Sequence, residues 1–204
     1  MTAVREAIVD TALNLAEDQG WEAVRLHDVA RRLGISLSTL SRYFREKDEI
    51  IDAWLDRADE AMLAEADRPG FGELPTRDRI HRLVMAYVER LGGHRRVTRE
   101  MIAHKLEFGH FHVQLPAILR ISRTVQWIRE ATRRDDTFFL RGLEETALTS
   151  VFVTAFLGWL KDDSHGFEQT RRRLDRMLAT GEAAARAAVP RLRKWPLPSL
   201  QLHI

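Results

Sequence analysis

Helix-length segments separated by glycines and prolines make up almost the whole chain, and this segmentation constrains the fold most. Within each segment apolar residues recur every three or four positions, as on one face of an α-helix, and no segment alternates as a strand does. Gly20, Gly34 and Pro190 mark three expected helix ends. The sequence therefore predicts an all-α protein, with helices over residues 2–18, 27–33, 37–44, from 47 onward, 78–91, 98–108, 116–133, 137–160 and 167–188.

Composition narrows the class of protein further. Of the 204 residues, 45% are apolar and 30% are charged, which is the balance of a globular chain. The absence of cysteine excludes a disulfide framework, a thiolate nucleophile and a cysteine-ligated zinc. Acidic residues interrupt the apolar pattern at the start of the chain, so we expect no signal peptide. The longest apolar segment, 147–160, is too short to span a bilayer, and we expect a cytoplasmic protein.

The distribution of charge gives no general attraction for nucleic acid. The formal net charge is +2, and residues 1–50 carry seven Lys and Arg against nine Asp and Glu. Any binding to nucleic acid must therefore come from a local cluster of residues rather than from bulk charge. The basic stretch lies elsewhere, in residues 171–194, where a solvated helix face is favoured over contact with DNA or an acidic membrane.

The first fifty residues contain the sequence features of a helix-turn-helix. Gly34 permits a tight turn, and Ser36 is a typical N-cap for the short helix that follows. Leu33, Ile35, Leu40 and Phe44 can fix the crossing of the two helices. The opposite side of the short helix is polar and flat enough to enter the major groove of DNA, and it consists of Leu37, Ser38, Thr39, Arg42 and Tyr43.

This segment also resembles a known family, the TetR-type repressors. The resemblance extends over residues 20–50, about thirty positions at fixed spacing. Its matching features are the Gly20-Trp21 turn, Val29-Ala30, Gly34-Ile35-Ser36, Thr39-Leu40, Tyr43-Phe44 and Lys47-Asp48. The resemblance implies about nine helices, a homodimer, double-stranded DNA read by the third helix at a palindromic operator, and a pocket for an effector in the C-terminal part. Beyond residue 50 it rests on the helix pattern alone.

The resemblance places a DNA-binding domain at residues 1–48 and a ligand-binding and dimerisation domain at residues 49–204. The candidate DNA-binding residues are Arg25, Leu37, Ser38, Thr39, Arg42, Tyr43 and Lys47. Lys47 is a candidate because it starts the fourth helix, where backbone N–H groups and the helix dipole favour an anion such as phosphate. Two positions depart from the family: Ser41 replaces an aromatic that contacts phosphate, and Arg25 replaces a helix-capping Ser or Thr. The retained motif leaves open a helical scaffold that no longer binds DNA.

The middle helices carry large apolar side chains on more than one side, as a ligand cavity requires. We expect a small hydrophobic effector to bind there, with a few polar groups to orient it. The candidate ligand-binding residues are Tyr87, Met101, His104, Phe108 and Trp127, with Gln126 as a further polar group. The alternative is that these side chains only fill the core.

The last two long helices present a wide apolar stripe with small residues that permit close approach of helices. The resemblance implies that these two helices form the dimer interface, through Val151, Ala155, Leu178, Gly181 and Ala185. An ordinary core within one chain would explain part of the same stripe. Residues 135–141 and 159–164 also resemble the ubiquinone-biosynthesis lipid-binding protein, which has the same fold without repressor activity. A lipid- or isoprenoid-binding protein without an operator is therefore the alternative function.

Nothing in the sequence indicates catalysis, a cofactor or a metal site. His110 and His112 are two positions apart, which suits neither one helical face nor a usual zinc pattern. No Ser/His/Asp arrangement with family spacing, P-loop or dinucleotide-binding glycine motif occurs. The sequence therefore predicts a transcriptional regulator, most simply a repressor released by its effector, and not an enzyme.

Overall fold

A computed structural model describes residues 2–106, 111–132 and 138–192 of the chain. The helices in this part are α1 Thr2–Gln19, α2 Leu26–Leu33, α3 Leu37–Leu40, α4 Asp48–Ala66, α5 Thr76–Leu91, α6 Arg95–Leu106, α7 Phe111–Ala131, α8 Phe138–Trp159 and α9 Glu168–Leu192. Short 3-10 turns lie at Phe71–Glu73, Gly92–His94 and His165–Phe167. The described residues contain no strand, and the all-α prediction is confirmed.

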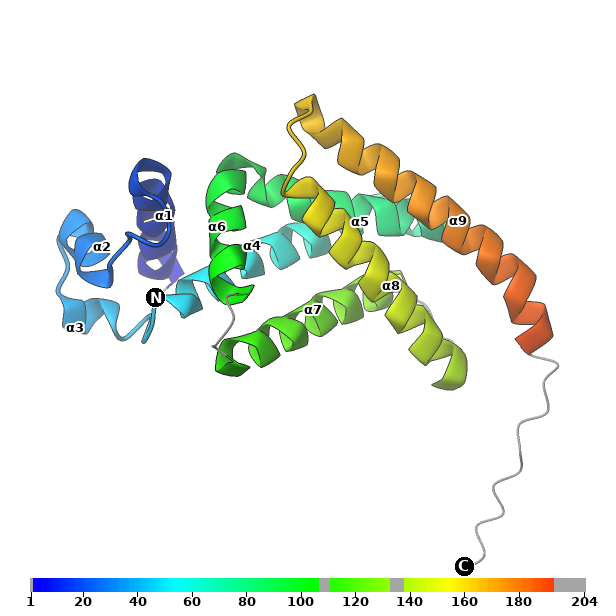
Figure 1. The fold of residues 1–204 in the computed structure, drawn as a ribbon, viewed down its shortest axis with the longest axis horizontal. Helices are drawn as coiled ribbons and strands as arrows, with labels where there is room; N and C mark the ends of the chain where they lie inside the picture. Colours follow the sequence, from blue (N-terminus) through cyan, green and yellow to red (C-terminus); the bar gives the residue numbers. More distant parts are fainter. Residues whose placement is uncertain (1, 107–110, 133–137, 193–204) are drawn as a thin grey trace, which may run out of the picture.

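The helices form a small unit at one end of the molecule and a larger body behind it. Helices α1, α2 and α3 gather at that end, and α4 runs from them into the body (Figure 1). In the body α4 packs along α5, while α8 lies against α7 and α9 (Figure 1). Helix α6 stands between the small unit and the rest of the body. None of the described helices is long and apolar enough to cross a bilayer.

Each part has its own large buried side chains. In the small unit Trp21, Leu40 and Phe44 are each 1% exposed, and in the body Trp54 and Trp159 are buried in the same way. The indole nitrogen of Trp54 donates a hydrogen bond to Thr98 Oγ1 at 2.9 Å, which satisfies its polar atom inside the core. The apolar spacing seen in the sequence thus corresponds to one continuous core that runs from α1 to α9.

Several helix boundaries differ from the prediction. The short helix expected over residues 37–44 ends at Leu40 and continues as turns. Helix α7 begins at Phe111, within a segment that the sequence predicts to be a loop, so Pro116 lies inside the helix and not in its first turn. Helix α9 also continues through Pro190, where the sequence predicts a helix end. Proline removes one backbone hydrogen bond and disfavours a helix interior, but the surrounding helix overrides this local preference here.

The start of α9 is organised by one carboxylate. Asp162 is 3% exposed, and its Oδ1 accepts hydrogen bonds from the backbone N–H of Ser164 at 2.9 Å and from Ser164 Oγ at 2.5 Å. Its Oδ2 accepts from the backbone N–H of Thr170 at 2.7 Å and from Thr170 Oγ1 at 2.6 Å. Burial alone would raise the pKa of Asp162, but these four hydrogen bonds outweigh burial and hold the pKa at about 2.

Replacing Asp162 by asparagine should lower the free energy of unfolding by about 2 kcal/mol at pH 7, the energy equivalent of its pKa depression. Because the pKa is lowered in the folded state, this stabilisation is present above about pH 4 and is lost as the pH falls towards 2. Urea unfolding of both proteins at several pH values measures the difference. Asp163→Asn, at the neighbouring residue with an 89% exposed side chain, is the control and should change little. A difference that stays constant from pH 7 to pH 2 would contradict this account.

Candidate nucleic-acid interface

The geometry of the small unit is set by two local devices at the turn between α2 and α3. Gly34 has a φ of 66°, in the left-handed region that glycine adopts at low cost, and its N–H closes α2 by bonding to the carbonyls of Ala30 and Arg31. Ser36 precedes α3 and its Oγ accepts from the backbone N–H of Thr39 at 3.1 Å. These devices hold α3 at a fixed angle to α2, as the sequence predicts.

Helix α3 and the turn after it have one buried side and one exposed side. Leu40 and Phe44 are buried in the apolar core, and Tyr43 is partly buried against the same core. Leu37, Ser38, Ser41 and Arg42 are exposed, with Leu37 retaining 52% of its surface. The exposed side is therefore short and mostly polar, and it lies at the end of the molecule farthest from α9 (Figure 1).

Hydroxyl groups on this segment bond mainly to one another. Ser36 Oγ lies 2.8 Å from Ser38 Oγ and 2.9 Å from Thr39 Oγ1, and Ser41 Oγ donates to the carbonyl of Ser38 at 3.1 Å. These three contacts use three of the four hydroxyl donors on the segment, which belong to Ser36, Ser38, Thr39 and Ser41. These hydrogen bonds stiffen the segment. The side chains of Leu37 and Arg42 take no part in them among the described contacts, and both are exposed.

Arg25 and Lys47, two further predicted DNA-binding residues, lie around the turn between α1 and α2. Arg25 is exposed at the start of α2, and its Nη1 donates to the carbonyl of Glu22 at 2.7 Å. Lys47 Nζ donates to the carbonyls of Trp21 at 2.6 Å and Glu22 at 3.2 Å and lies 4.7 Å from the centre of the Trp21 ring. Burial lowers the pKa of Lys47. Lys47 thus ties this turn to the start of α4 and retains one ammonium donor for a phosphate.

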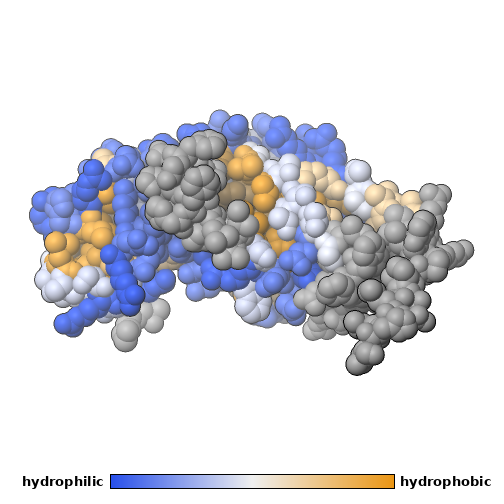
Figure 2. All heavy atoms as spheres, turned by 60° about the horizontal axis from the view of Figure 1, so that its bottom comes forward, coloured by the Kyte–Doolittle hydropathy of each residue, from blue (hydrophilic) through white to orange (hydrophobic). Residues whose placement is uncertain are grey.

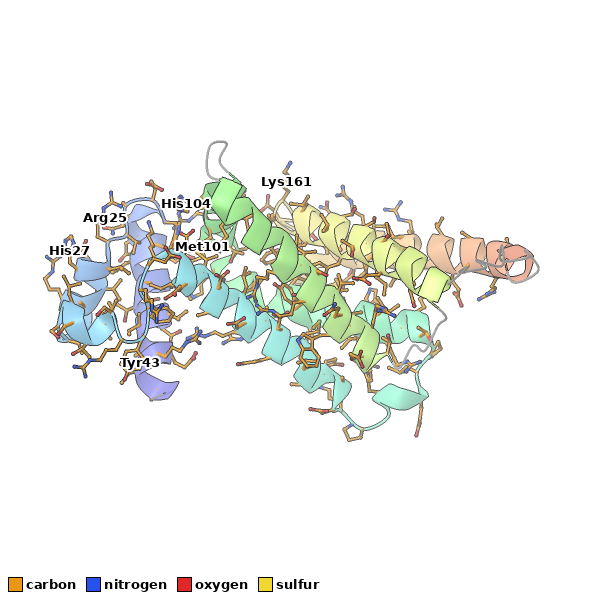
Figure 3. All side chains as sticks on the ribbon, turned by 90° about the horizontal axis from the view of Figure 1, so that it is seen from below. Arg25, His27, Tyr43, Met101, His104 and Lys161 are labelled. Carbon is orange, nitrogen blue, oxygen red and sulfur yellow. The ribbon has the colours of Figure 1, made fainter. Side chains whose placement is uncertain are left out.

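Several polar contacts, which the sequence did not reveal, join the small unit to α6. The backbone N–H of Trp21 donates to Glu100 Oε2 at 2.7 Å, and Arg96 Nη2 donates to the carbonyl of Glu17 at 2.6 Å. Farther along α6, His104 lies between Glu22, at 3.3 Å, and the first residue of α4, Asp48, at 3.5 Å. Figure 3 shows Arg25, His27 and Tyr43 in the small unit and Met101 and His104 beside it on α6. Helix α6 is therefore in direct polar contact with the small unit.

The predicted ligand-binding residues are not gathered at one place. Tyr87 is buried, with its ring centre 5.2 Å from that of Phe152, and Met101 is fully buried on α6. His104 faces the small unit, while Trp127 is 45% exposed and Gln126 is exposed. Phe108 lies outside the described residues. The described residues contain no group of three or more His, Asp or Glu side chains arranged to hold a metal ion, and His110 lies outside them.

A buried polar cluster adjoins Tyr87 between α4 and α7. Arg120 is 8% exposed, and its Nη1 and Nη2 donate to Asp56 at 2.8 Å and Asp59 at 2.9 Å. Thr124 Oγ1 also donates to Asp59, at 2.8 Å. Burial raises the pKa of Asp59, while Arg120 and Thr124 lower it, and burial also raises the pKa of Tyr87. Because its carboxylate and guanidinium groups are paired, the cluster is compatible with a closed core.

The predicted dimer residues divide into two groups. Ala155 and Leu178 are buried at the contact between α8 and α9 within one chain, and Val151 is partly buried there. Gly181 and Ala185 are exposed, as is the rest of α9 from residue 180 to residue 187. The C-terminal half of α9 extends beyond the other helices (Figure 1). A core within one chain therefore accounts for part of the stripe, while Gly181 and Ala185 remain uncovered in the single chain.

A three-helix unit with a short, rigidly held third helix and an exposed polar face defines the helix-turn-helix class of DNA-binding protein. Residues 8–54 match the family model for bacterial regulatory proteins of the tetR family. The crystal structure of a TetR transcriptional regulator from Nitrosomonas europaea is 49% identical, covers 87% of this chain and 97% of its own, and superposes with a TM-score of 0.79. A TetR transcriptional regulator from Rhodococcus sp. RHA1 shares the fold, with a TM-score of 0.66 at 17% identity, over 88% of this chain and 96% of its own.

Curated relatives match over shorter stretches. The HTH-type transcriptional repressor KstR of Mycolicibacterium smegmatis is 38% identical over 64 residues, 31% of each chain. The HTH-type transcriptional regulator EthR of Mycobacterium tuberculosis is 34% identical over 98 residues, 46% of this chain and 44% of its own. The chain thus spans less than half the length of these curated relatives. Together with the Nitrosomonas europaea structure, the family model shows that the chain belongs to the TetR family of bacterial regulatory proteins, whose members are transcriptional regulators and not enzymes.

Proposed function

We propose that this TetR-family regulator binds a palindromic operator as a homodimer and represses transcription from it. The observation that carries the proposal is the exposed face of α3, which a glycine turn and a serine cap hold on a packed core. The repressor role is supported by KstR, which is named as a repressor. Residues 1–48 act as the DNA-binding domain and residues 49–204 as the ligand-binding and dimerisation domain. The alternative of a lipid-binding protein without an operator is not favoured, because the matches are to regulators.

The dimer forms through α8 and α9, with the uncovered small residues of α9 at its centre. Two copies related by a two-fold axis would place two α3 helices on successive turns of the same face of DNA. Exposed Arg25 and Arg42, together with the remaining donor of Lys47, then contact phosphates or bases, while Ser38, Thr39 and Tyr43 complete the surface that meets the groove. Local arginines supply the attraction that the net charge of the first fifty residues lacks.

A small apolar effector releases the repressor from its operator. Support comes from the ring cluster of Tyr87, Phe152 and Phe156 in the body and from the polar junction that couples α6 to the small unit. Release requires that the ligand bind one dimer geometry better than the other. A panel of apolar molecules would therefore have to yield a compound that both raises the thermal unfolding temperature and lowers the affinity for DNA. A compound that does only the first would show binding without release, and a panel that produces neither effect would favour the alternative that these side chains only fill the core.

Titration of the full chain with random-sequence duplex tests DNA binding without knowledge of the operator. We expect binding at about 50 mM salt that weakens linearly with the logarithm of salt concentration, because bound phosphates release counterions. Arg42→Ala should weaken this binding about tenfold, because in random-sequence duplex its guanidinium can contact phosphate, and loss of one phosphate contact has about this effect near 50 mM salt. Arg172→Ala, at a residue with a 74% exposed side chain on α9, is the matched control and should bind as the wild type does. Failure of the wild type to bind duplex at low salt would refute the proposal.

A further inference from the structure

The surface of the DNA-binding unit contains an exposed apolar side chain that its fold does not require. Leu37 is 52% exposed at the first position of α3, whereas Leu40 in the same helix is 1% exposed. Hydrophobic residues reach the surface at the end of the molecule that carries α2 and α3, among hydrophilic neighbours (Figure 2). An isolated exposed leucine is common on protein surfaces, so exposure alone assigns no role to it. Its neighbours make the position informative.

Most of the polar groups beside Leu37 already form hydrogen bonds within the protein. Ser36, Ser38 and Thr39 bond to one another through their hydroxyl groups, and Ser41 donates to the carbonyl of Ser38. Of these four hydroxyl donors, one remains available to a base edge. Arg42 is exposed and suits guanine, whose O6 and N7 atoms both accept hydrogen bonds. Besides Arg42, the segment from Ser36 to Ser41 therefore offers few free side-chain hydrogen-bond donors, and Leu37 adds a large apolar surface beside them.

Only one base presents an apolar group in the major groove. Thymine carries a C5-methyl group there beside its O4 acceptor, while the other three bases present only hydrogen-bonding atoms. An exposed leucine placed against a polar base edge would desolvate that edge without replacing its hydrogen bonds. We propose that Leu37 is a specificity-determining residue that reads the C5-methyl group of a thymine in each operator half-site. This inference rests on the proposed operator-binding function.

Replacing thymine by uracil in the DNA tests the contact, because uracil lacks only the methyl group. The probe is a duplex enriched by the wild-type chain from a random pool, re-synthesised with each thymine changed to uracil in turn. At one thymine per half-site we expect the affinity of the wild type to fall about fourfold, which corresponds to loss of one buried methyl-sized group. For Leu37→Ala the same change should have no effect, so a double-mutant cycle isolates the contact from changes in DNA shape.

The matched control is Val4→Ala, which shortens another exposed apolar side chain in the same unit, one that is 38% exposed. This variant should keep the full sensitivity to uracil. Because Leu37 is half exposed, Leu37→Ala should unfold at the wild-type temperature. If the chain binds a selected duplex tightly but no uracil position weakens binding, or if Leu37→Ala keeps the sensitivity, the inference is wrong and the proposed function stands. If no duplex is enriched at all, the proposed function fails and takes the inference with it.

Discussion

Replacing Arg120 by methionine is expected to lower the free energy of unfolding by about 3 kcal/mol near pH 8. The guanidinium of Arg120 is buried and bonds to both Asp56 and Asp59. Once Arg120 is removed, Thr124 is the remaining hydrogen-bond donor to the buried carboxylate of Asp59 among the described contacts. Methionine fills a similar volume, so the loss reports an unpaired charge rather than a cavity.

The same variant should be less destabilised at pH 5 than at pH 8. Burial already raises the pKa of Asp59, and loss of Arg120, which lowers that pKa, raises it further. Above this raised pKa the folded state must hold a buried charge, and below it the carboxyl binds a proton and the penalty falls. The double variant Arg120→Met, Asp59→Leu should recover most of the stability, while Arg172→Met at the exposed α9 pair should change little. A small, pH-independent loss in urea unfolding would contradict the assigned burial of this cluster.

Introducing arginine at Ala185 is expected to convert the proposed dimer to monomer. Ala185 is exposed in the single chain, so the substitution disturbs no contact within it. In a two-fold interface through α9 both copies carry the substitution, so the interface buries two arginine charges without partners. We expect dimerisation to weaken at least a hundredfold, about 3 kcal/mol, as measured by sedimentation equilibrium. DNA affinity should fall with it, because two half-sites then bind independently.

Ala183→Arg is the matched control for this experiment. Residue 183 is also exposed on α9, but two positions correspond to a rotation of about 200° around the helix axis. The control therefore adds the same charge to the opposite face and should remain a dimer with wild-type DNA affinity. A wild-type chain that sediments as a monomer at micromolar concentration, or a dimer that both variants leave intact, would remove the proposed interface.

The parts of the fold that the sequence predicts well are those fixed by neighbouring residues. Gly34 and Ser36 act within four positions of themselves, and the apolar spacing of α1 and α2 is a local pattern as well. The arrangement of the small unit can therefore be predicted from the sequence alone. By contrast, local preference predicts helix boundaries at Pro116 and Pro190, and both lie inside helices that their surroundings maintain.

The polar junction and the buried cluster are not predictable in the same way. Glu100 meets Trp21 across 79 positions of sequence, and Arg120 meets Asp59 across 61. Helix periodicity predicts that such charged residues face solvent. It contains no information on which helix faces contact each other, so it cannot predict these pairs. For the same reason the sequence predicts that His104 orients a ligand in the body, whereas its ring lies between two carboxylates at the junction with the small unit.

In the proposed function this chain reads DNA sequence through α3 as a pair of identical subunits. Selection from a pool of random duplexes with the full chain at low salt measures whether it does so. We expect enrichment of an inverted repeat whose half-sites lie about one helical turn, or a multiple of it, apart. Arg42→Ala should lose preference at positions within each half-site. A wild-type chain that retains duplex yet enriches no sequence, or enriches a single unrepeated site, would contradict the proposed function.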